Sequence, residues 1–129
     1  MNMYLVAAAV LTIVVGLAHS VLGEILIFRG MRQDGLVPTN GGGLLRESNV
    51  RILWASWHVL TVLGLGIAAV LWWLAMPPTH AYSSEYPRQA LALTMLVGAA
   101  IVGIATKGRH PGWAGLLGVA ILAWCGRAM

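Results

Sequence analysis

Two histidines lie within stretches of this sequence that are apolar enough to cross a membrane. His19 lies in a stretch from about residue 3 to 28, and His58 in one from about residue 50 to 76. Each stretch exceeds the roughly 20 apolar residues that span the hydrocarbon of a bilayer. Ionisable side chains in such segments are costly and usually face the interior of a bundle, a partner or a cavity. We therefore expect the chemistry of this protein to involve His19 and His58.

The two histidines are predicted to lie at nearly the same depth. At 1.5 Å per residue, His19 lies about 13 Å before the end of its stretch, and His58 about 12 Å after the start of the next. Consecutive antiparallel helices would bring both rings to one level. Neutral imidazole binds zinc, copper, iron and haem, so the pair predicts a metal ion or a b-type haem. We expect Glu24 and His110 as further metal ligands, although neither has helical metal-motif spacing.

A second predicted contact in this region is an ion pair between Glu24 and Arg51. Glu24 follows His19 and Arg51 precedes His58, so both charges lie closer to the same membrane face than the histidines. Each charge buried alone would be expensive, and pairing lowers this cost. Arg51 also has a local alternative, because Glu47 precedes it at the spacing of neighbours on one helical face.

Composition places these residues in a membrane protein. The chain has 129 residues, of which 59% are hydrophobic and only 9% are charged, whereas soluble domains carry roughly 25% charged residues. Two more apolar stretches follow, at about 88–106 and 111–126. We therefore expect residues 1–129 to form a single transmembrane domain, an all-α four-helix bundle with up-down-up-down topology. The single cysteine, Cys125, excludes an internal disulfide.

The basic residues predict the orientation in the membrane. Only Arg88 and Arg127 lie on the side of the termini, and the others lie in or beside the first and third loops (Arg29, Arg32, Arg46, Arg51, Lys107 and Arg109). The positive-inside rule puts these loops in the cytoplasm and both termini outside. The histidine site then lies in the cytoplasmic half of the bilayer. We expect a bacterial inner-membrane protein surrounded by lipid, and no nucleic acid partner despite the net charge of +4.

Sequence motifs assign the chain to no class of enzyme. The glycine run at residues 41–43 lies in the long first loop, but no strand pattern precedes it and no Gly-Lys-Ser/Thr follows it. It therefore does not match a phosphate-binding P-loop. The sequence also lacks the Gly-x-Ser-x-Gly and His-Glu-x-x-His motifs of hydrolases and metalloproteases.

Three functions are compatible with this pattern. The first is a metal or haem site, with redox chemistry as one use of it. The second is a path for protons or small solutes within a homo-oligomer, since Glu–His chains relay protons in membrane proteins. The third is a non-catalytic accessory or assembly subunit of a larger membrane complex, in which the polar residues only join helices. We favour the metal or haem site, because two ligands at one level suit a point site better than a route across the membrane.

Overall fold

Four α-helices make up most of the structure. The computed structural model describes residues 1–77 and 85–126. They contain the helices α1 (Met3–Leu26), α2 (Glu47–Ala75), α4 (Glu85–Ala105) and α5 (Gly112–Cys125), and a short 3-10 helix, η1 (Phe28–Met31). The prediction of an all-α chain with four helices is confirmed for this part of the chain. Three of them, α1, α2 and α4, are long and apolar enough to cross a membrane, and α5 is a shorter apolar helix.

The observed bounds differ from the predicted ones mainly where polar residues extend a helix. α1 stops at Leu26, before the expected residue 28, because the chain tightens into η1. α2 and α4 begin earlier than expected, at Glu47 and Glu85, where a carboxylate in the first turn is favoured by the helix dipole. Arg127, which contributed to the predicted orientation, lies outside the described residues.

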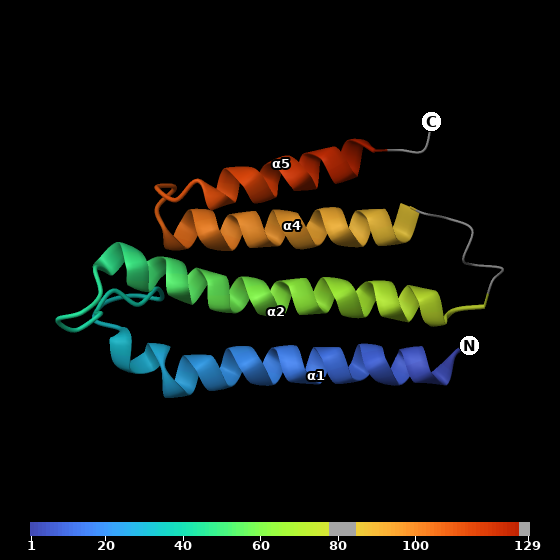
Figure 1. Cartoon of the computed structure of the whole chain (residues 1–129), viewed down its shortest axis with the longest axis horizontal. Helices are drawn as coiled ribbons and strands as arrows, with labels where there is room; N and C mark the ends of the chain where they lie inside the picture. Colours follow the sequence, from blue (N-terminus) through green and yellow to red (C-terminus); the bar gives the residue numbers. More distant parts are fainter. Residues whose placement is uncertain (78–84, 127–129) are drawn as a thin grey trace.

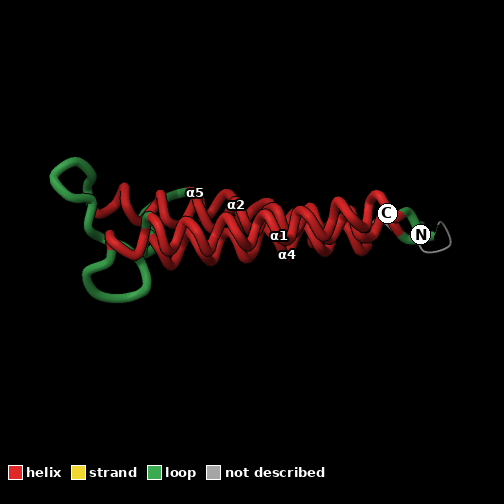
Figure 2. Tube along the Cα trace, turned by 90° about the horizontal axis from the view of Figure 1, so that it is seen from below, coloured by secondary structure: helices red, strands yellow, loops and turns green. Residues whose placement is uncertain are grey.

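The helices lie side by side in a single layer. α1 packs against α2, α2 against α4, and α4 against α5. Figure 1 shows the four helices in chain order, and from a direction at 90° they overlie one another in a thin band (Figure 2). A four-helix bundle packed around one core would also bring α5 against α1, and the described helices make no extensive contact of that kind.

Hydrogen bonds at the helix ends join neighbouring helices. The Asn2 N–H donates to the carbonyl of Ala75 (2.8 Å), so α1 begins beside the end of α2. Arg51 donates from Nη1 to the carbonyl of Ala105 (3.1 Å), which joins the start of α2 to the end of α4. Arg88, at the start of α4, donates to carbonyls at the end of α5. These bonds also satisfy C-terminal carbonyls that have no partner within their own helix.

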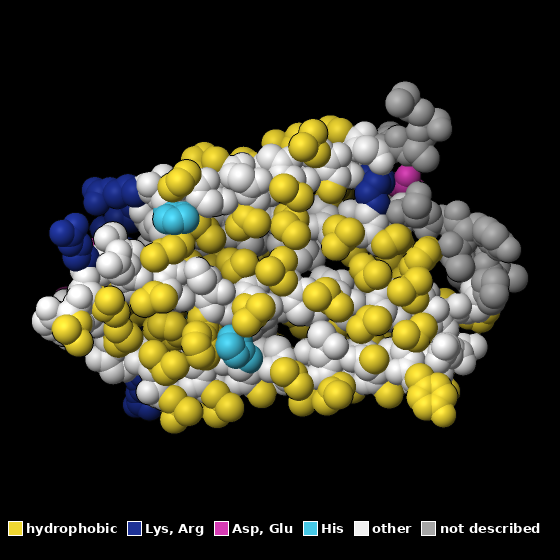
Figure 3. Space-filling model, viewed as in Figure 1, with side chains coloured by type: hydrophobic (Ala, Val, Ile, Leu, Met, Phe, Trp, Pro, Cys, Tyr) yellow, Lys and Arg dark blue, Asp and Glu magenta, His cyan; other side chains and the backbone are white. Residues whose placement is uncertain are grey.

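Small residues let side chains of the neighbouring helix lie directly against a helix backbone. A Cβ at Gly23 would lie 2.0 Å from Trp57 Nε1, and one at Gly66 would lie 2.3 Å from Thr94 Oγ1. Such narrow seams of small residues are typical of helix pairs in lipid. Hydrophobic side chains cover much of the remaining surface (Figure 3).

A lysine with a left-handed backbone occupies the turn between α4 and α5. Lys107 has a φ of 53° and Gly108 a φ of 71°. The Gly108 N–H donates to Gly103 O (2.8 Å) and the Lys107 N–H to Ile104 O (3.2 Å), which is the pattern of a Schellman motif. Glycine is the usual residue at this position, because the left-handed conformation costs other residues roughly 1–2 kcal/mol. Lys107 therefore adopts a backbone conformation that is unfavourable for a residue with a Cβ.

Candidate functional site

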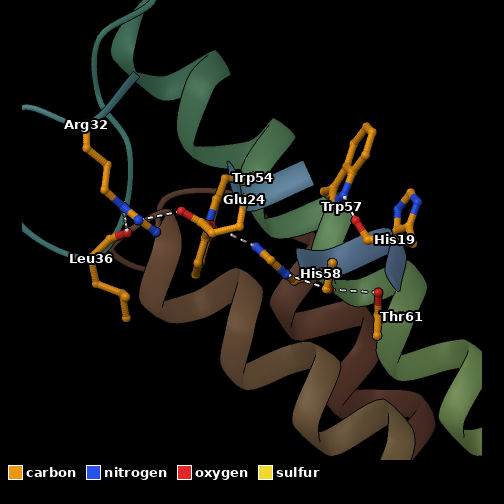
Figure 4. A network of polar contacts seen from close by, with 9 residues as sticks. His19, Glu24, Arg32, Leu36, Trp54, Trp57, His58 and Thr61 are labelled. Atoms are coloured by element: carbon orange, nitrogen blue, oxygen red, sulfur yellow. Dashed lines mark hydrogen bonds and ion pairs between the residues drawn. The ribbon is translucent and has the colours of Figure 1, made fainter. Parts of the chain in front are cut away.

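A chain of polar side chains runs along the interface between α1 and α2 (Figure 4). At its inner end, Thr61 Oγ1 lies within hydrogen-bonding distance of the Gly16 carbonyl (3.0 Å) and of Ser20 Oγ (2.8 Å). Ser20 Oγ also lies 2.8 Å from Nδ1 of His58. Thr61 is buried, and Ser20 and His58 are partly buried, so the protein shields these hydrogen bonds.

Glu24 forms the outer end of the chain. Its Oε2 accepts a hydrogen bond from Trp54 Nε1 (3.1 Å) and lies 3.5 Å from Nε2 of His58. Arg32, which follows η1, forms an ion pair with the other carboxylate oxygen and donates from Nε to the carbonyl of Leu36 (2.7 Å). The side chains of Glu24 and Arg32 are each 27% exposed. The chain therefore connects the molecular surface with the interior of the hairpin.

Helical spacing places these residues on two facing surfaces. They recur every three or four positions along each helix (Gly16, Ser20 and Glu24 on α1; Trp54, His58 and Thr61 on α2). Side chains at this spacing lie on one face of an α-helix. Gly23 lets the Trp57 indole lie directly against α1, which brings the two faces close enough for direct hydrogen bonds.

The hydrogen bonds of this chain can run in either of two directions. If Thr61 donates to the Gly16 carbonyl, Ser20 donates to Thr61, and His58 must carry its proton on Nδ1. If Thr61 donates to Ser20 instead, Ser20 donates to Nδ1, and the proton of the neutral ring lies on Nε2, facing Glu24. A hydroxyl both donates and accepts, and a neutral imidazole has one nitrogen of each kind. Reversing the direction of the Ser20 and Thr61 hydrogen bonds therefore moves the ring proton of His58 between Nδ1 and Nε2.

The first of these two arrangements leaves a place for one additional proton. With the His58 proton on Nδ1, the lone pair of Nε2 faces the Glu24 carboxylate at 3.5 Å. Two groups that only accept hydrogen bonds cannot bond to each other. A proton on either Glu24 or Nε2 converts this contact into a hydrogen bond or an ion pair. The arrangement can thus bind a proton at Glu24 and His58 and release one toward Ser20.

His19 lies at the same interface but has partners different from those of His58 (Figure 4). Its ring stacks on Trp57, with centroids 4.3 Å apart and planes 8° apart, and its carbonyl accepts from Trp57 Nε1 (3.0 Å). Its Nε2 is buried without a hydrogen-bond partner. Successive residues of a helix point about 100° apart, so Ser20, and not His19, takes the position beside His58. The expected arrangement of two facing histidine ligands is therefore not what the structure has.

The predicted ion pair between Glu24 and Arg51 is wrong. Glu24 pairs with Arg32, and Arg51 donates from Nε to Glu47 Oε1 (2.7 Å). The reason is that α2 begins at Glu47, which places this carboxylate one helical turn before Arg51. Arg51 also reaches α4 through the Ala105 carbonyl, on the side away from α1. The local alternative for Arg51 is the one that forms.

His110 lies apart from the other two histidines, at the turn between α4 and α5. Its N–H donates to Thr106 Oγ1 (3.4 Å), and its Nδ1 accepts from the Gly112 N–H (3.1 Å). Over residues 1–77 and 85–126, no group of three or more His, Cys, Asp or Glu side chains is placed to hold a metal ion. The four predicted ligands are thus not assembled around one point.

Several residues of the polar chain were not among the predicted site residues. They are Ser20, Thr61, Trp54 and Arg32. The available signal was the spacing of four between Gly16, Ser20 and Glu24, which places a hydroxyl and a carboxylate on one face. A prediction based only on the histidines misses this spacing, because hydroxyl side chains are common in membrane helices.

No family model, no curated protein and no solved structure matches this chain.

Proposed function

We propose that this chain is an integral membrane protein whose α1–α2 hairpin binds and transfers protons. The observation that supports the proposal is the chain of exchangeable groups from Glu24 through His58 and Ser20 to Thr61. Histidine is the side chain that most readily changes charge near neutral pH. Ionisable residues inside membrane helices commonly form proton relays.

Each residue of the chain has a distinct part in this proposal. Glu24 takes up a proton at the partly exposed end, where Arg32 and Trp54 orient its carboxylate. His58 receives the proton on Nε2 and releases another from Nδ1 to Ser20. The hydroxyls of Ser20 and Thr61 pass it on by rotating. The 3.5 Å separation between Glu24 and His58 is long for a hydrogen bond, so transfer requires a small tilt of the ring or one bridging water.

A groove on the hairpin lies at the inner end of the chain, and a water molecule in it would accept the proton from Thr61 and carry it away. The groove has a volume of about 410 Å³ and begins where the polar chain ends, since both Gly16 and Thr61 line it. Thr12 and His19 contribute its other polar side chains. Thr12 lies one helical turn beyond Gly16, so the groove extends the route past the inner end of the hydrogen-bonded chain.

The proposal includes the expected orientation, with up-down-up-down helices and both termini outside a bacterial inner membrane. Three helices of spanning length support the membrane placement. Most of the Lys and Arg atoms visible in Figure 3 gather at the end of the layer that contains the α1–α2 connection and the α4–α5 turn, which supports a cytoplasmic location for that end. Glu24 would then take protons from the cytoplasm.

The test is proton flux into liposomes that contain the purified full-length protein. Valinomycin and a potassium gradient supply the driving force, and an enclosed pH-sensitive dye reports the flux. Thr61→Val keeps the shape of the side chain and removes the hydroxyl, and Thr94→Val is the matched control on α4. Both threonines are buried. We expect Glu24→Gln, His58→Gln and Thr61→Val to lower the flux by about 100-fold or more, in the range typical of a lost proton-transfer group.

Two results would contradict the proposal. One is wild-type flux no greater than that of protein-free liposomes. The other is an equal loss in Thr61→Val and Thr94→Val, which would show that a buried hydroxyl matters only for the stability of the helices.

The metal or haem site at His19 and His58 remains a prediction from the sequence, with a separate test. An absorption spectrum and elemental analysis of the protein purified in mild detergent would reveal a Soret band or a stoichiometric metal. The accessory-subunit prediction also remains, and the large apolar side chains exposed on α1 are compatible with a partner in the membrane. Neither is favoured by the hydrogen-bond geometry, since both nitrogens of His58 already face Ser20 and Glu24.

A further inference from the structure

A basic cleft lies where the start of α2 meets the turn between α4 and α5. It has a volume of about 310 Å³, and Arg51, Lys107, Arg109 and His110 line it. Glu47 is the only carboxylate among its lining residues, and it is paired with Arg51. With His110 neutral, the charged side chains of the cleft therefore carry a net charge of +2. Such a cleft is suited to a phosphate group, which accepts hydrogen bonds from arginine and lysine.

An apolar groove continues from this cleft toward the middle of the layer. The groove has a volume of about 530 Å³ and shares two residues, Ile52 and His110, with the cleft. Its walls come from α2 and α5, and Val102 of α4 also lines it. Along α2 it extends from Ile52 to Leu63, about 16 Å at 1.5 Å per residue. One leaflet of a bilayer has a hydrocarbon depth of about 15 Å, so the groove has the length of one leaflet.

We propose that the cleft and groove together bind one anionic phospholipid. The phosphate lies in the basic cleft, and one acyl chain lies in the groove between α2 and α5. A free phosphate would use the cleft alone, and a neutral apolar molecule would use the groove alone. The continuity of a positively charged cleft with an apolar groove of one-leaflet length matches a molecule that has both parts.

Lys107 is the residue whose placement most directly supports the site. Its backbone has a φ of 53°, where glycine would be the less strained residue. The side chain of Lys107 lines the basic cleft. Backbone strain of this kind is maintained at functional positions more often than elsewhere. A glycine in this turn would keep the fold and remove one of the phosphate ligands.

His110 joins the two parts of the site. Its Nδ1 accepts from the Gly112 N–H, so the neutral ring carries its proton on Nε2 and retains one donor. Because His110 lines both the cleft and the groove, this donor lies at the level where the phosphate and glycerol of a lipid would meet the acyl chain. Gly115 also lines the groove, and a Cβ at this position would meet nothing within 4 Å.

The test is lipid binding to the full-length protein, measured by native mass spectrometry after purification in mild detergent. Phosphatidylglycerol is the anionic probe, and phosphatidylcholine with the same acyl chains is the zwitterionic control. We expect phosphatidylglycerol to bind at one site per chain and at least about 10-fold more tightly than phosphatidylcholine, from roughly fivefold per basic group near an anionic headgroup.

Two pairs of variants separate the headgroup from the acyl chain. Lys107→Gln combined with Arg109→Gln should weaken phosphatidylglycerol binding by about 30-fold. Arg29→Gln, at the same end of the helical layer but outside the cleft, should leave it unchanged. Gly115→Leu should weaken it by about 10-fold, since each methylene displaced from apolar contact is worth about a factor of four. Gly118→Leu is its control, because Gly118 has the same open space but does not line the groove.

Competition distinguishes a lipid from a soluble anion. If an excess of inorganic phosphate displaces phosphatidylglycerol and Gly115→Leu has no effect, the site binds free phosphate and the lipid proposal is overturned. Equal binding of the two lipids, or equal binding by the wild type and the Lys107/Arg109 double variant, overturns it as well. Lys107→Gly provides a second charge-removing variant with a less strained turn, so a folding defect in the double variant does not prevent the test.

Discussion

His58 is held by Ser20 through Nδ1, and its Nε2 faces Glu24 at 3.5 Å. An amide side chain could also lie between Ser20 and Glu24, but it cannot gain or lose a proton near neutral pH. His19 has a similar depth and a different environment, because its ring stacks on Trp57 and its Nε2 is buried without a partner. His19 and His58 thus lie at a similar depth but contact different side chains.

Lys107 gives a prediction about stability at the scale of a single residue. We expect Lys107→Gly to raise the free energy of unfolding by roughly 1 kcal/mol, because glycine adopts the left-handed conformation without the steric cost to a residue with a Cβ. Thermal unfolding in detergent measures the change. Lys107→Ala is the control, since it removes the same charge and keeps the strained φ. If Lys107→Ala stabilises the protein as much as Lys107→Gly, repulsion between charges and not the backbone is the cause.

The individual site residues were only partly predictable. Helical rise fixes the depth of a residue, but matching depths paired His19 with His58 and Glu24 with Arg51, whereas the structure places Glu24 Oε2 3.5 Å from His58 Nε2. The partners of each side chain depend on rotation about the helix axis and on rotamers, which depth does not determine. The false pairing of Glu24 with Arg51 arose because two residues at matching depth can face different neighbours. Arg32 was missed as a partner because it follows α1 and η1, where no periodic pattern indicates its position.

At the scale of helices, the close approach of α1 and α2 at Gly23 gives a second prediction. We expect Gly23→Ala to destabilise the protein by roughly 1–3 kcal/mol, the usual cost of overpacking, because the added Cβ would lie 2.0 Å from Trp57 Nε1. Gly64→Ala is the matched control on α2, since its Cβ would lie 3.9 Å from Thr12 Cγ2, an ordinary contact. Thermal unfolding in detergent checks both. Equal effects of the two substitutions would refute the close packing at Gly23.

The existence of the four helices was predictable because long apolar stretches leave few alternatives in lipid, where backbone groups must bond within the helix. The start of α2 at Glu47 lies before the predicted apolar stretch, although the spacing of Glu47 and Arg51 already indicated a helical turn there. Glu47 belongs to the helix although the apolar stretch begins later, because hydrophobicity marks the part of a helix inside the membrane and not the turn that precedes it. This early start is what gives Arg51 a partner within its own helix.

For the molecule as a whole, the proposed orientation predicts which side of the membrane the α1–α2 connection faces. In a chain whose native cysteine has been replaced (Cys125→Ser), a Gly43→Cys substitution should react with a membrane-impermeant maleimide only after the cells are permeabilised. Gly43 is suitable because an added Cβ meets nothing within 4 Å and its φ is not positive, unlike that of Gly42. Labelling in intact cells would contradict the orientation.

The single layer could not be predicted, because the helices are apolar around most of their circumference. In a soluble bundle, the apolar stripe of each helix identifies the face that packs against its neighbours. Helices in lipid are apolar on all sides, so this information is absent. Small residues such as Gly23 and Gly66 indicate where two helices can approach, but they do not say whether the last helix returns to the first.

The layered arrangement also determines how the two proposed sites can influence one another. Extensive packing links only consecutive helices, so the α1 residues of one proposed site and the α4–α5 turn of the other are joined mainly through α2. Along that helix, Arg51 belongs to one site, and Trp54 and His58 belong to the other, within two turns. Val37 of the α1–α2 connection offers a second link, because it packs against the cluster of Ala55, Val102 and Ala105. By thermodynamic linkage any free-energy coupling between lipid and proton would be reciprocal, so a lipid that changes the proton affinity of His58 would itself be held more or less tightly as that proton binds.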